Sequence, residues 1–308
     1  MRLFPPSSLA PAVPAGAEYD LIAPAAQAEP RSFDPAAPSS ARSVDPPGSL
    51  AALVARLPSA RAAEPAEVAA LLGPAARRPW VAAFLNAHAV NLCAADPSVR
   101  AAFAGADLVL RDGAGVSILM RWLGRDPGAN MNGTDLIPKL AAAEGARVAL
   151  YGARPGVAEA AAEALRARGA QVVAVRHGYH PLAAYESWLA EDAAPVEAGG
   201  RGATLVVLGM GMPRQEALAL RLRDAAPAPV GILCGGAVLD FLSGNAVRAP
   251  RWMRNAGLEW SWRLLREPRR LFRRYVIGNP LFLARAALLA AGARLRTASE
   301  RQSPATSP

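Results

Sequence analysis

The chain has 308 residues, of which 52% are hydrophobic and 19% are charged. This apolar content is enough to bury a sizeable core, so intrinsic disorder of the whole chain is excluded. The net charge is +9 and it is concentrated near the end of the chain, where residues 245–308 contain thirteen arginines and three glutamates. A basic segment of this kind attracts phosphate ligands, acidic lipid headgroups or nucleic acid.

Both cysteines lie in apolar runs, which is typical of small buried hydrophobic residues in a reducing compartment rather than of disulfides. The first residues lack the continuous apolar core of a signal peptide. The nearest candidate for a membrane-spanning helix, residues 276–295, is interrupted by Asn279, Pro280 and Arg285, so we expect no spanning helix. The sequence therefore predicts a cytoplasmic protein that is soluble or attached to a membrane surface.

Three segments of different composition follow one another along the chain. Residues 1–48 form a Pro/Ala/Ser tract without periodicity, and we expect this tract to be disordered. Residues 49–247 begin with short helical patterns and continue with apolar runs that alternate with helical stretches. Residues 248–308 are rich in arginine and tryptophan, and we expect a basic helical appendage there.

Six apolar runs have the length of β-strands. They lie at residues 81–85, 107–110, 147–151, 171–175, 204–208 and 230–234. Because the runs are continuous rather than alternating, both faces of each strand are buried, as in a parallel sheet. The alternation of strands with helices predicts an α/β fold with a doubly wound, mostly parallel, Rossmann-like sheet.

In such sheets ligands bind at the carboxyl ends of the strands, so polar residues just after each apolar run are candidates for function. Asn86 and His88 follow the first run; they either bind a sugar or a ribose, or serve as a turn asparagine and a capping histidine. Asp112 follows the second run, before a turn that Gly113 and Gly115 allow to be tight. Its carboxylate either accepts a proton from a substrate hydroxyl or caps the next helix.

Two glycine turns precede predicted helices. Gly152 and Gly156 form one, and Gly209 and Gly211 the other; backbone amides at such helix starts can receive a phosphate. Neither turn has the GxGxxG or the P-loop spacing, which argues against a nicotinamide-dependent oxidoreductase. Gln215, in the first turn of the second helix, would face whatever lies above the sheet.

The sequence offers no evident metal site. His177 and His180 lie close together, but only one further histidine, His88, is present, and a zinc site needs three or four ligands. No DxD motif occurs, so a divalent cation bridging a nucleotide diphosphate has no evident carboxylate ligands.

The arginines of the appendage recur every three or four residues, at Arg263, Arg266, Arg270, Arg273 and Arg274, with aromatic residues between them. This spacing fits a solvated cationic helix packed through its aromatic residues. It also fits two functions, a clamp for pyrophosphate and attachment to anionic lipid. No recognised nucleic-acid-binding module accompanies the arginines.

Eight segments occur in order along most of the chain: FLNAHAVNL, ADLVLRDGAGV, NGTDL, YGARPGVAEAAA, HGYH, LGMGMPRQE, GGAVLDFLSG and RAPRWMRNAGLEWSWRLLREPRRLFRRY. Each is a weak signal by itself, but the ordered set resembles the WecG/TagA/CpsF family of bacterial glycosyltransferases (glycosyltransferase family 26) over residues 79–280. The resemblance implies an inverting, metal-independent transferase without a cofactor. Its partners would be a UDP-sugar donor and a polyprenyl-diphosphate-linked saccharide acceptor at the inner face of the cell membrane.

The resemblance also implies roles for particular residues. Asp112 matches the base that deprotonates the acceptor hydroxyl, and Asn86 a second catalytic residue. Further matches are Tyr179, Gln215 and Asp240 at the substrates, with Gly152 and Gly209 in the glycine turns. The appendage arginines Arg263, Arg270 and Arg273 match those that fold over the site and hold the diphosphate.

Two positions depart from the members that act in teichoic-acid synthesis. Where those members carry a threonine and an arginine, this chain holds Phe84 and Asn130, and it offers His88, Asn132 and Thr134 as further substrate-binding residues. This difference favours the exopolysaccharide branch, which adds glucose, over transfer of N-acetylmannosamine.

The family resemblance further implies docking on the anionic inner-membrane surface, a homo-oligomer whose balance with the monomer is linked to docking, and no nucleic-acid partner. An alternative function is a non-catalytic membrane-associated or nucleotide-binding Rossmann-like protein, which would leave the polar residues at the strand ends without a purpose.

Overall fold

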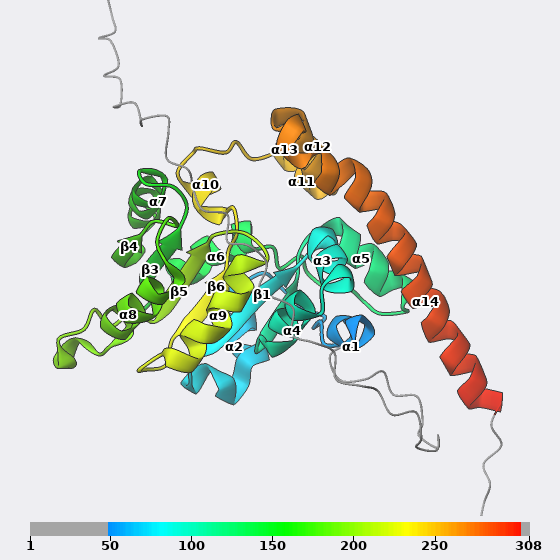
Figure 1. The fold of residues 1–308 in the computed structure, drawn as a ribbon, viewed down its shortest axis with the longest axis horizontal. Helices are drawn as coiled ribbons and strands as arrows, with labels where there is room; N and C mark the ends of the chain where they lie inside the picture. Colours follow the sequence, from blue (N-terminus) through cyan, green and yellow to red (C-terminus); the bar gives the residue numbers. More distant parts are fainter. Residues whose placement is uncertain (1–48, 303–308) are drawn as a thin grey trace, which may run out of the picture. The chain divides into compact units, whose positions relative to one another are not determined.

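A six-stranded sheet forms the centre of the fold (Figure 1), and its strands lie in the order β2-β1-β6-β5-β3-β4. The computed structural model describes residues 49–302, and their side chains as far as residue 296. The tract 1–48 lies outside the described residues. The described residues belong to one compact unit, Val44–Pro308, and the boundary expected at 247/248 stays a prediction.

The strands confirm the expected α/β fold, and every pairing between them is parallel. Each strand begins and ends within one residue of the apolar run that predicted it. Their bounds are β1 Trp80–Leu85, β2 Leu108–Arg111, β3 Arg147–Gly152, β4 Gln171–Arg176, β5 Leu205–Gly209 and β6 Gly231–Cys234.

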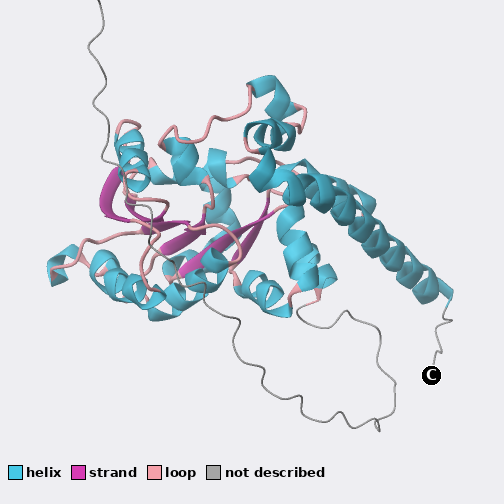
Figure 2. Ribbon diagram, turned by 45° about the horizontal axis from the view of Figure 1, so that its top comes forward, coloured by secondary structure: helices cyan, strands magenta, loops and turns pink. Residues whose placement is uncertain are grey.

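Helices cover both faces of the sheet (Figure 2). One face carries α1 (Leu50–Ala55), α3 (Ala87–Ala95), α4 (Pro97–Gly105), α5 (Gly113–Trp122), α8 (Leu182–Ala193) and α9 (Arg214–Ala225). The other carries α2 (Pro65–Leu72), α6 (Gly133–Ala141), α7 (Val157–Arg166) and α10 (Val238–Leu242). Two short 3-10 helices, η1 (Gly73–Arg77) and η2 (Val196–Ala198), lie between these elements.

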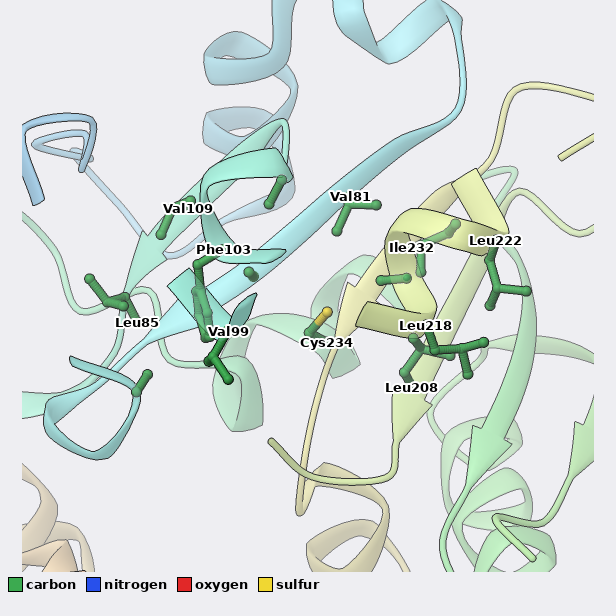
Figure 3. Close-up of a cluster of buried hydrophobic side chains, with 14 of the residues drawn as sticks. Val81, Leu85, Val99, Phe103, Val109, Leu208, Leu218, Leu222, Ile232 and Cys234 are labelled. Carbon is green, nitrogen blue, oxygen red and sulfur yellow. The ribbon is translucent and has the colours of Figure 1, made fainter. Parts of the chain in front are cut away.

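Alternate residues of one strand enter two separate cores. Val81 and Leu85 of β1 belong to the core under α3, α4 and α9, part of which is drawn in Figure 3, whereas Ala82 and Phe84 belong to the opposite core. Burial on both faces is the reason that the strands are apolar throughout rather than at every second residue.

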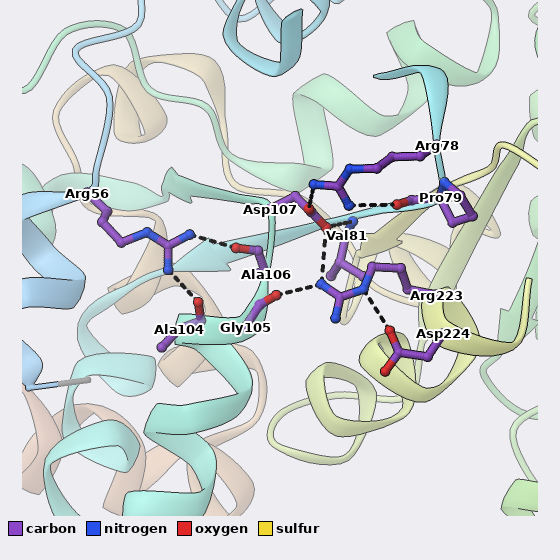
Figure 4. Close-up of polar contacts among 10 residues, drawn as sticks. All are labelled: Arg56, Arg78, Pro79, Val81, Ala104, Gly105, Ala106, Asp107, Arg223 and Asp224. Atoms are coloured by element: carbon purple, nitrogen blue, oxygen red, sulfur yellow. Dashed lines mark hydrogen bonds and ion pairs between the residues drawn. The ribbon is translucent and has the colours of Figure 1, made fainter. Parts of the chain in front are cut away.

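The amino edge of the sheet is held by a charged cluster (Figure 4) around Asp107, the residue before β2. Its carboxylate accepts hydrogen bonds from the backbone N–H of Val81 (3.0 Å), from Arg78 (2.8 Å) and from Arg223 (3.3 Å). Burial by itself would raise the pKa of Asp107, but these hydrogen bonds hold it below its ordinary value. This cluster joins the starts of β1 and β2 to α9.

Between Arg251 and Gln302 the C-terminal segment consists mainly of helices, as expected. It comprises α11 (Arg251–Asn255), α12 (Glu259–Arg266), α13 (Pro268–Phe272), the π-helical turn η3 (Arg273–Ile277) and α14 (Gly278–Gln302). Helix α14 runs along α3 and α5 (Figure 1), and its Phe282 and Ala286 are buried in the core beneath them.

The expectation of no spanning helix rested on interruptions at Asn279, Pro280 and Arg285, but the helix continues through all three positions. By length and composition Pro268–Arg296 is one helix that is long and apolar enough to cross a bilayer, and only 17% of its most apolar window is buried. Pro280 does not end the helix, because the π-helical turn just before it changes the hydrogen-bonding register. Arg285 is accommodated by Asn91 of α3, whose carbonyl and side-chain oxygens accept its hydrogen bonds at 3.0 and 2.8 Å.

A second buried charged residue lies near the other edge of the sheet, where β4 is the last strand. Asp192 of α8 is 0% exposed, and its carboxylate accepts a hydrogen bond from the hydroxyl of Tyr151 (2.8 Å) and pairs with Arg176 (3.2 Å) and Arg201 (2.9 Å). These contacts hold α8 against the ends of β3 and β4.

Replacing Asp192 by alanine should therefore lower the free energy of unfolding by about 2–4 kcal/mol, because it leaves the buried hydroxyl of Tyr151 without its acceptor and removes the buried carboxylate that pairs with Arg176 and Arg201. Urea-induced unfolding measures this change. Glu191→Ala is the matched control, since Glu191 pairs with the same two arginines from an exposed position, and its loss should cost less than about 1 kcal/mol. Equal effects of the two variants would contradict this role of Asp192.

Candidate functional site

An open groove of about 1310 Å³ lies over the carboxyl edge of the sheet. Residues at or just after the end of every strand contribute to its lining, and α12, α13, η3 and α14 supply the opposite wall. Pockets for a single small ligand typically measure 300–1000 Å³. The groove is therefore large enough for two substrates at once.

Asp112 lies at the N-cap position of α5, yet its side chain makes no capping hydrogen bond. The side-chain oxygen of Asn130 accepts the hydrogen bond from the N–H of Gly113 instead, at 2.9 Å. Of the two interpretations of Asp112, the capping one is thus not what the structure shows. The carboxylate is left to face the groove.

Asn86 holds this carboxylate from the neighbouring strand. Its side-chain oxygen caps α3 by accepting a hydrogen bond from Ala89 N–H (3.0 Å), and this fixes the orientation of the amide. The NH₂ group then points at Asp112 and donates to its Oδ2 at 3.2 Å. Asn86 is thus both a cap and a partner of the carboxylate.

The pKa of Asp112 is raised above its ordinary value. Burial raises it, while the hydrogen bond from Asn86 and the positive charges of Arg274 and Arg263 oppose that effect in part. A raised pKa makes the carboxylate a stronger base than an exposed aspartate.

His88, the second residue of α3, lines the groove. Burial, with a further contribution from the charge of Arg274, lowers its pKa to about 4. The ring is neutral near pH 7, so it can offer one hydrogen-bond donor and one acceptor to a sugar hydroxyl.

Arginines dominate the wall that faces the strand ends. Arg263, Arg270 and Arg273 line the groove as predicted, and Arg274 and Arg285 do so as well. Arg273 is exposed, whereas Arg274 is half-buried and its buried Nε has no hydrogen-bond partner. Burial lowers the pKa of Arg274, and the positive charges of neighbouring arginines lower it further.

Contacts from the core fix this wall in place. Asp135 of α6 binds Arg248 through both of its oxygens and Arg254 at 3.5 Å. The Trp262 indole donates to Val247 O at 3.1 Å. At the other end, the Asn91 amide donates to Gly278 O at 2.7 Å. The arginine-bearing helices are thus attached at both ends.

Most of the residues predicted for the site line the groove: Asn86, His88, Asp112, Thr134, Tyr179, Gly209, Gln215, Asp240, Arg263, Arg270 and Arg273. Two do not. Asn132 caps α6 through Asp135 N–H (2.9 Å). Gly152 has a φ of 136° and lies so close to Gly209 that a Cβ would be 2.5 Å from a backbone carbon, so packing between β3 and β5 already accounts for this glycine.

Several groove residues were not singled out from the sequence. Arg154, Arg214 and Asn91 line the groove and lie within the segments that carry the family resemblance, although no role was predicted for them; Arg285 also lines the groove and lies outside those segments. Arg274 belongs to the recognised arginine run, but its inward position depends on η3, which a regular helical spacing does not predict.

The structure brings no three His, Cys, Asp or Glu side chains together as a metal-ligand group within residues 49–302. The rings of His177 and His180 stack on each other with centroids 4.0 Å apart, and His180 also meets the edge of Trp188. These two histidines thus form part of an aromatic cluster at the end of β4.

A comparison with protein families gives a match over most of the described residues. The family model described as "Glycosyl transferase WecG/TagA/CpsF family" matches residues 58–297. The match covers the sheet, the groove residues and most of the C-terminal helices.

Because the pKa of His88 is about 4 in the folded protein and near 6.5 in an unfolded chain, the unfolded state takes up this proton first. The contribution of neutral His88 to the free energy of unfolding is complete above pH 6.5 and falls as the pH drops toward 4. Between pH 7 and pH 5, the wild type should therefore lose about 1 kcal/mol more of its free energy of unfolding than His88→Gln does, after allowance for solvent screening. Urea-induced unfolding at both pH values measures this, and identical pH dependence in the two proteins would contradict it.

Proposed function

We propose, from the premise that the chain belongs to the WecG/TagA/CpsF family of glycosyltransferases, that it moves a sugar from a UDP-sugar to a polyprenyl-diphosphate-linked saccharide in cell-surface polysaccharide synthesis. One observation carries the proposal. A carboxylate of raised pKa, Asp112, faces the groove instead of capping its helix, with arginines opposite it.

In the proposed reaction, a hydroxyl oxygen of the acceptor attacks the anomeric carbon of the donor. The new carbon–oxygen bond forms as the bond from that carbon to the UDP oxygen breaks, and the hydroxyl proton passes to Asp112. The attack comes from the side opposite to UDP, so the configuration at the anomeric carbon inverts. Asn86 keeps the carboxylate in one orientation throughout.

The charge that develops on the departing UDP needs compensation. Arg263, Arg270 and Arg273 line the groove, and guanidinium groups bind phosphate oxygens through paired hydrogen bonds. We propose that they do so without a divalent metal, as the resemblance to the family implies.

Glucose is the donor sugar that we favour, with N-acetylmannosamine as the alternative. Asn130 and Phe84 stand where teichoic-acid-type members differ, and Asn130 is engaged in capping Gly113 N–H. Neutral groups at the groove, His88 and Thr134, are suited to hydroxyl groups of a neutral sugar.

We also propose that the C-terminal helices bind the anionic inner face of the cell membrane. Helix α14 has large apolar side chains that point away from the core, among them Leu288 and Leu295, which are 73% and 72% exposed. Apolar residues together with arginines are the composition of helices that lie in a membrane interface. A homo-oligomer linked to this docking remains an expectation.

The test of the function is UDP release by the full chain in EDTA, with a panel of UDP-sugars and a short-chain polyprenyl-diphosphate-linked sugar. We expect acceptor-dependent release from one donor. Release that needs an added metal would overturn the arginine clamp but not the transferase. UDP binding without release from any donor would favour the nucleotide-binding alternative.

Asp112→Asn should lower kcat by about 10²–10⁴ while UDP binding is retained, because the amide keeps the shape of the carboxylate but cannot accept the proton. In the wild type, the acidic limb of the pH–rate profile should lie above 3.8, the ordinary pKa of aspartate, since the pKa of Asp112 is raised. Steady-state kinetics and calorimetric titration with UDP measure these effects. A variant with wild-type kcat would rule out Asp112 as the base.

The double variant Leu288→Glu, Leu295→Glu should lose sedimentation with vesicles that contain phosphatidylglycerol, since it places charge on the outward face of α14. Val196→Glu is the control, because Val196 is also an exposed apolar residue, at 54% exposure, but lies in η2 on another part of the surface. If both proteins sediment with vesicles like the wild type, α14 does not carry the docking.

A further inference from the structure

A buried polar pair, Gln215 and Glu216, lies beneath the groove in the first turn of α9. Their side chains are 0% and 1% exposed. Buried polar groups are costly unless their hydrogen bonds are made. Two such groups side by side therefore need an explanation that simple packing of α9 does not give.

The amide of Gln215 makes four hydrogen bonds, all within the protein. Its oxygen accepts from Gly211 N–H at 3.1 Å and from Gly236 N–H at 3.0 Å. Its nitrogen donates to the Glu216 carboxylate at 2.8 Å and to Cys234 O at 3.1 Å. Gln215 thus joins the loop after β5 to the loop after β6, and both loops line the groove.

The direction of this amide depends on its acceptors. An amide that is turned by 180° would point its NH₂ group at the two glycine N–H groups, donor against donor. Cys234 O occupies one N–H of the Gln215 amide, and Glu216 is the acceptor for the other. The carboxylate therefore determines which end of the amide faces the glycine loops.

The surroundings of Glu216 are apolar except for Gln215. Its second oxygen is buried without a hydrogen-bond partner, and burial raises its pKa to about 7. The titratable groups that respond to its charge are the thiols of Cys93 on α3 and Cys234 on β6, whose own pKa values are raised by burial. No charged group of α4, α8, β1 or β5, which also pack against α9, is among the groups that shift the pKa of Glu216 within residues 49–302.

We propose that Glu216 is a positioning residue for nucleotide binding. Through Gln215 it holds the N–H groups of Gly211 and Gly236, and hence the two glycine loops, in the conformation that receives the donor. This inference rests on the proposed function for the identity of the nucleotide. The hydrogen-bond chain itself does not depend on it.

The sharpest variant is Glu216→Met, which keeps the volume of the side chain but removes the acceptor. The variant leaves one buried N–H of Gln215 unpaired, which lowers stability, but it also removes a buried carboxyl whose second oxygen has no partner, which raises stability. The melting temperature should therefore change little, while the affinity for UDP falls about tenfold. A purely structural role of Glu216 predicts the reverse, lower stability with unchanged affinity.

Glu216→Gln is the matched control, because its side-chain oxygen still accepts the hydrogen bond from Gln215. We expect its UDP affinity to stay within about threefold of the wild type. A loss as large as that of the methionine variant would show that the charge, and not the acceptor, is what matters, and would overturn the proposal.

Hydrogen exchange followed by mass spectrometry supplies a readout that needs no ligand. Peptides containing Gly211 and Gly236 should exchange faster in Glu216→Met than in the wild type and in Glu216→Gln. Unchanged exchange in the methionine variant would refute the positioning role. If exchange changes as expected but UDP does not bind the wild type, the inference stands and the proposed donor is wrong.

Titration with UDP at pH 8 and pH 6 adds a further check. The wild type should lose more affinity toward pH 6 than Glu216→Gln does, since Glu216 becomes protonated across this interval and a carboxylic acid is a weaker acceptor than a carboxylate. The phosphate of UDP also titrates near pH 6, but equally in both proteins. Equal losses of UDP affinity in the wild type and in Glu216→Gln would contradict the part of the proposal that links positioning to the protonation of Glu216.

Discussion

Parallel strand pairing is the constraint on which the rest of the structure depends. Because every strand runs in the same direction, all carboxyl ends meet at one edge, and residues far apart in the chain become neighbours there. Asn86 and Asp112 come together because β1 and β2 pair with Leu85 beside Arg111. The loops joined by Gln215 come together in the same way, because β5 pairs with β6.

The second organising feature is electrostatic. The C-terminal helices place several arginines opposite the strand ends, and these cations repel one another. Burial lowers the pKa of His88, and the charge of Arg274 lowers it further. Contacts of Asn91 and Asp135 hold them there. A diphosphate bound between the two walls would offset this repulsion, so ligand binding and the position of the C-terminal helices are expected to be energetically coupled.

The sequence predicted the sheet well because its signal is local: apolar runs of strand length, most of them followed by glycine, mark the strands to within one residue. It also indicated Asn86 and Asp112, since ligands bind at the carboxyl ends of parallel strands and both residues directly follow an apolar run. It could not decide whether Asp112 caps α5, because the start of that helix is bound by Asn130, which lies seventeen residues after Gly113.

Other features depended on contacts or backbone geometry that have no sequence pattern. The inward position of Arg274 follows from the π-helical turn η3, and the continuous helix through Pro280 and Arg285 follows from that turn and from Asn91. Gln215 was expected to face the ligand, but the amide is fully engaged within the protein. Its role as a direct substrate contact stays a prediction.

The central claim is that Asp112 activates an acceptor hydroxyl for direct attack on the donor sugar. The measurement that tests it most directly is the anomeric configuration of the transferred sugar, read by NMR from the product formed with an α-linked UDP-sugar. Direct attack predicts a β-linked product, because the bond to UDP breaks on the face opposite to the new bond. An α-linked product would contradict the account, since it requires two displacements or attack from the side of UDP.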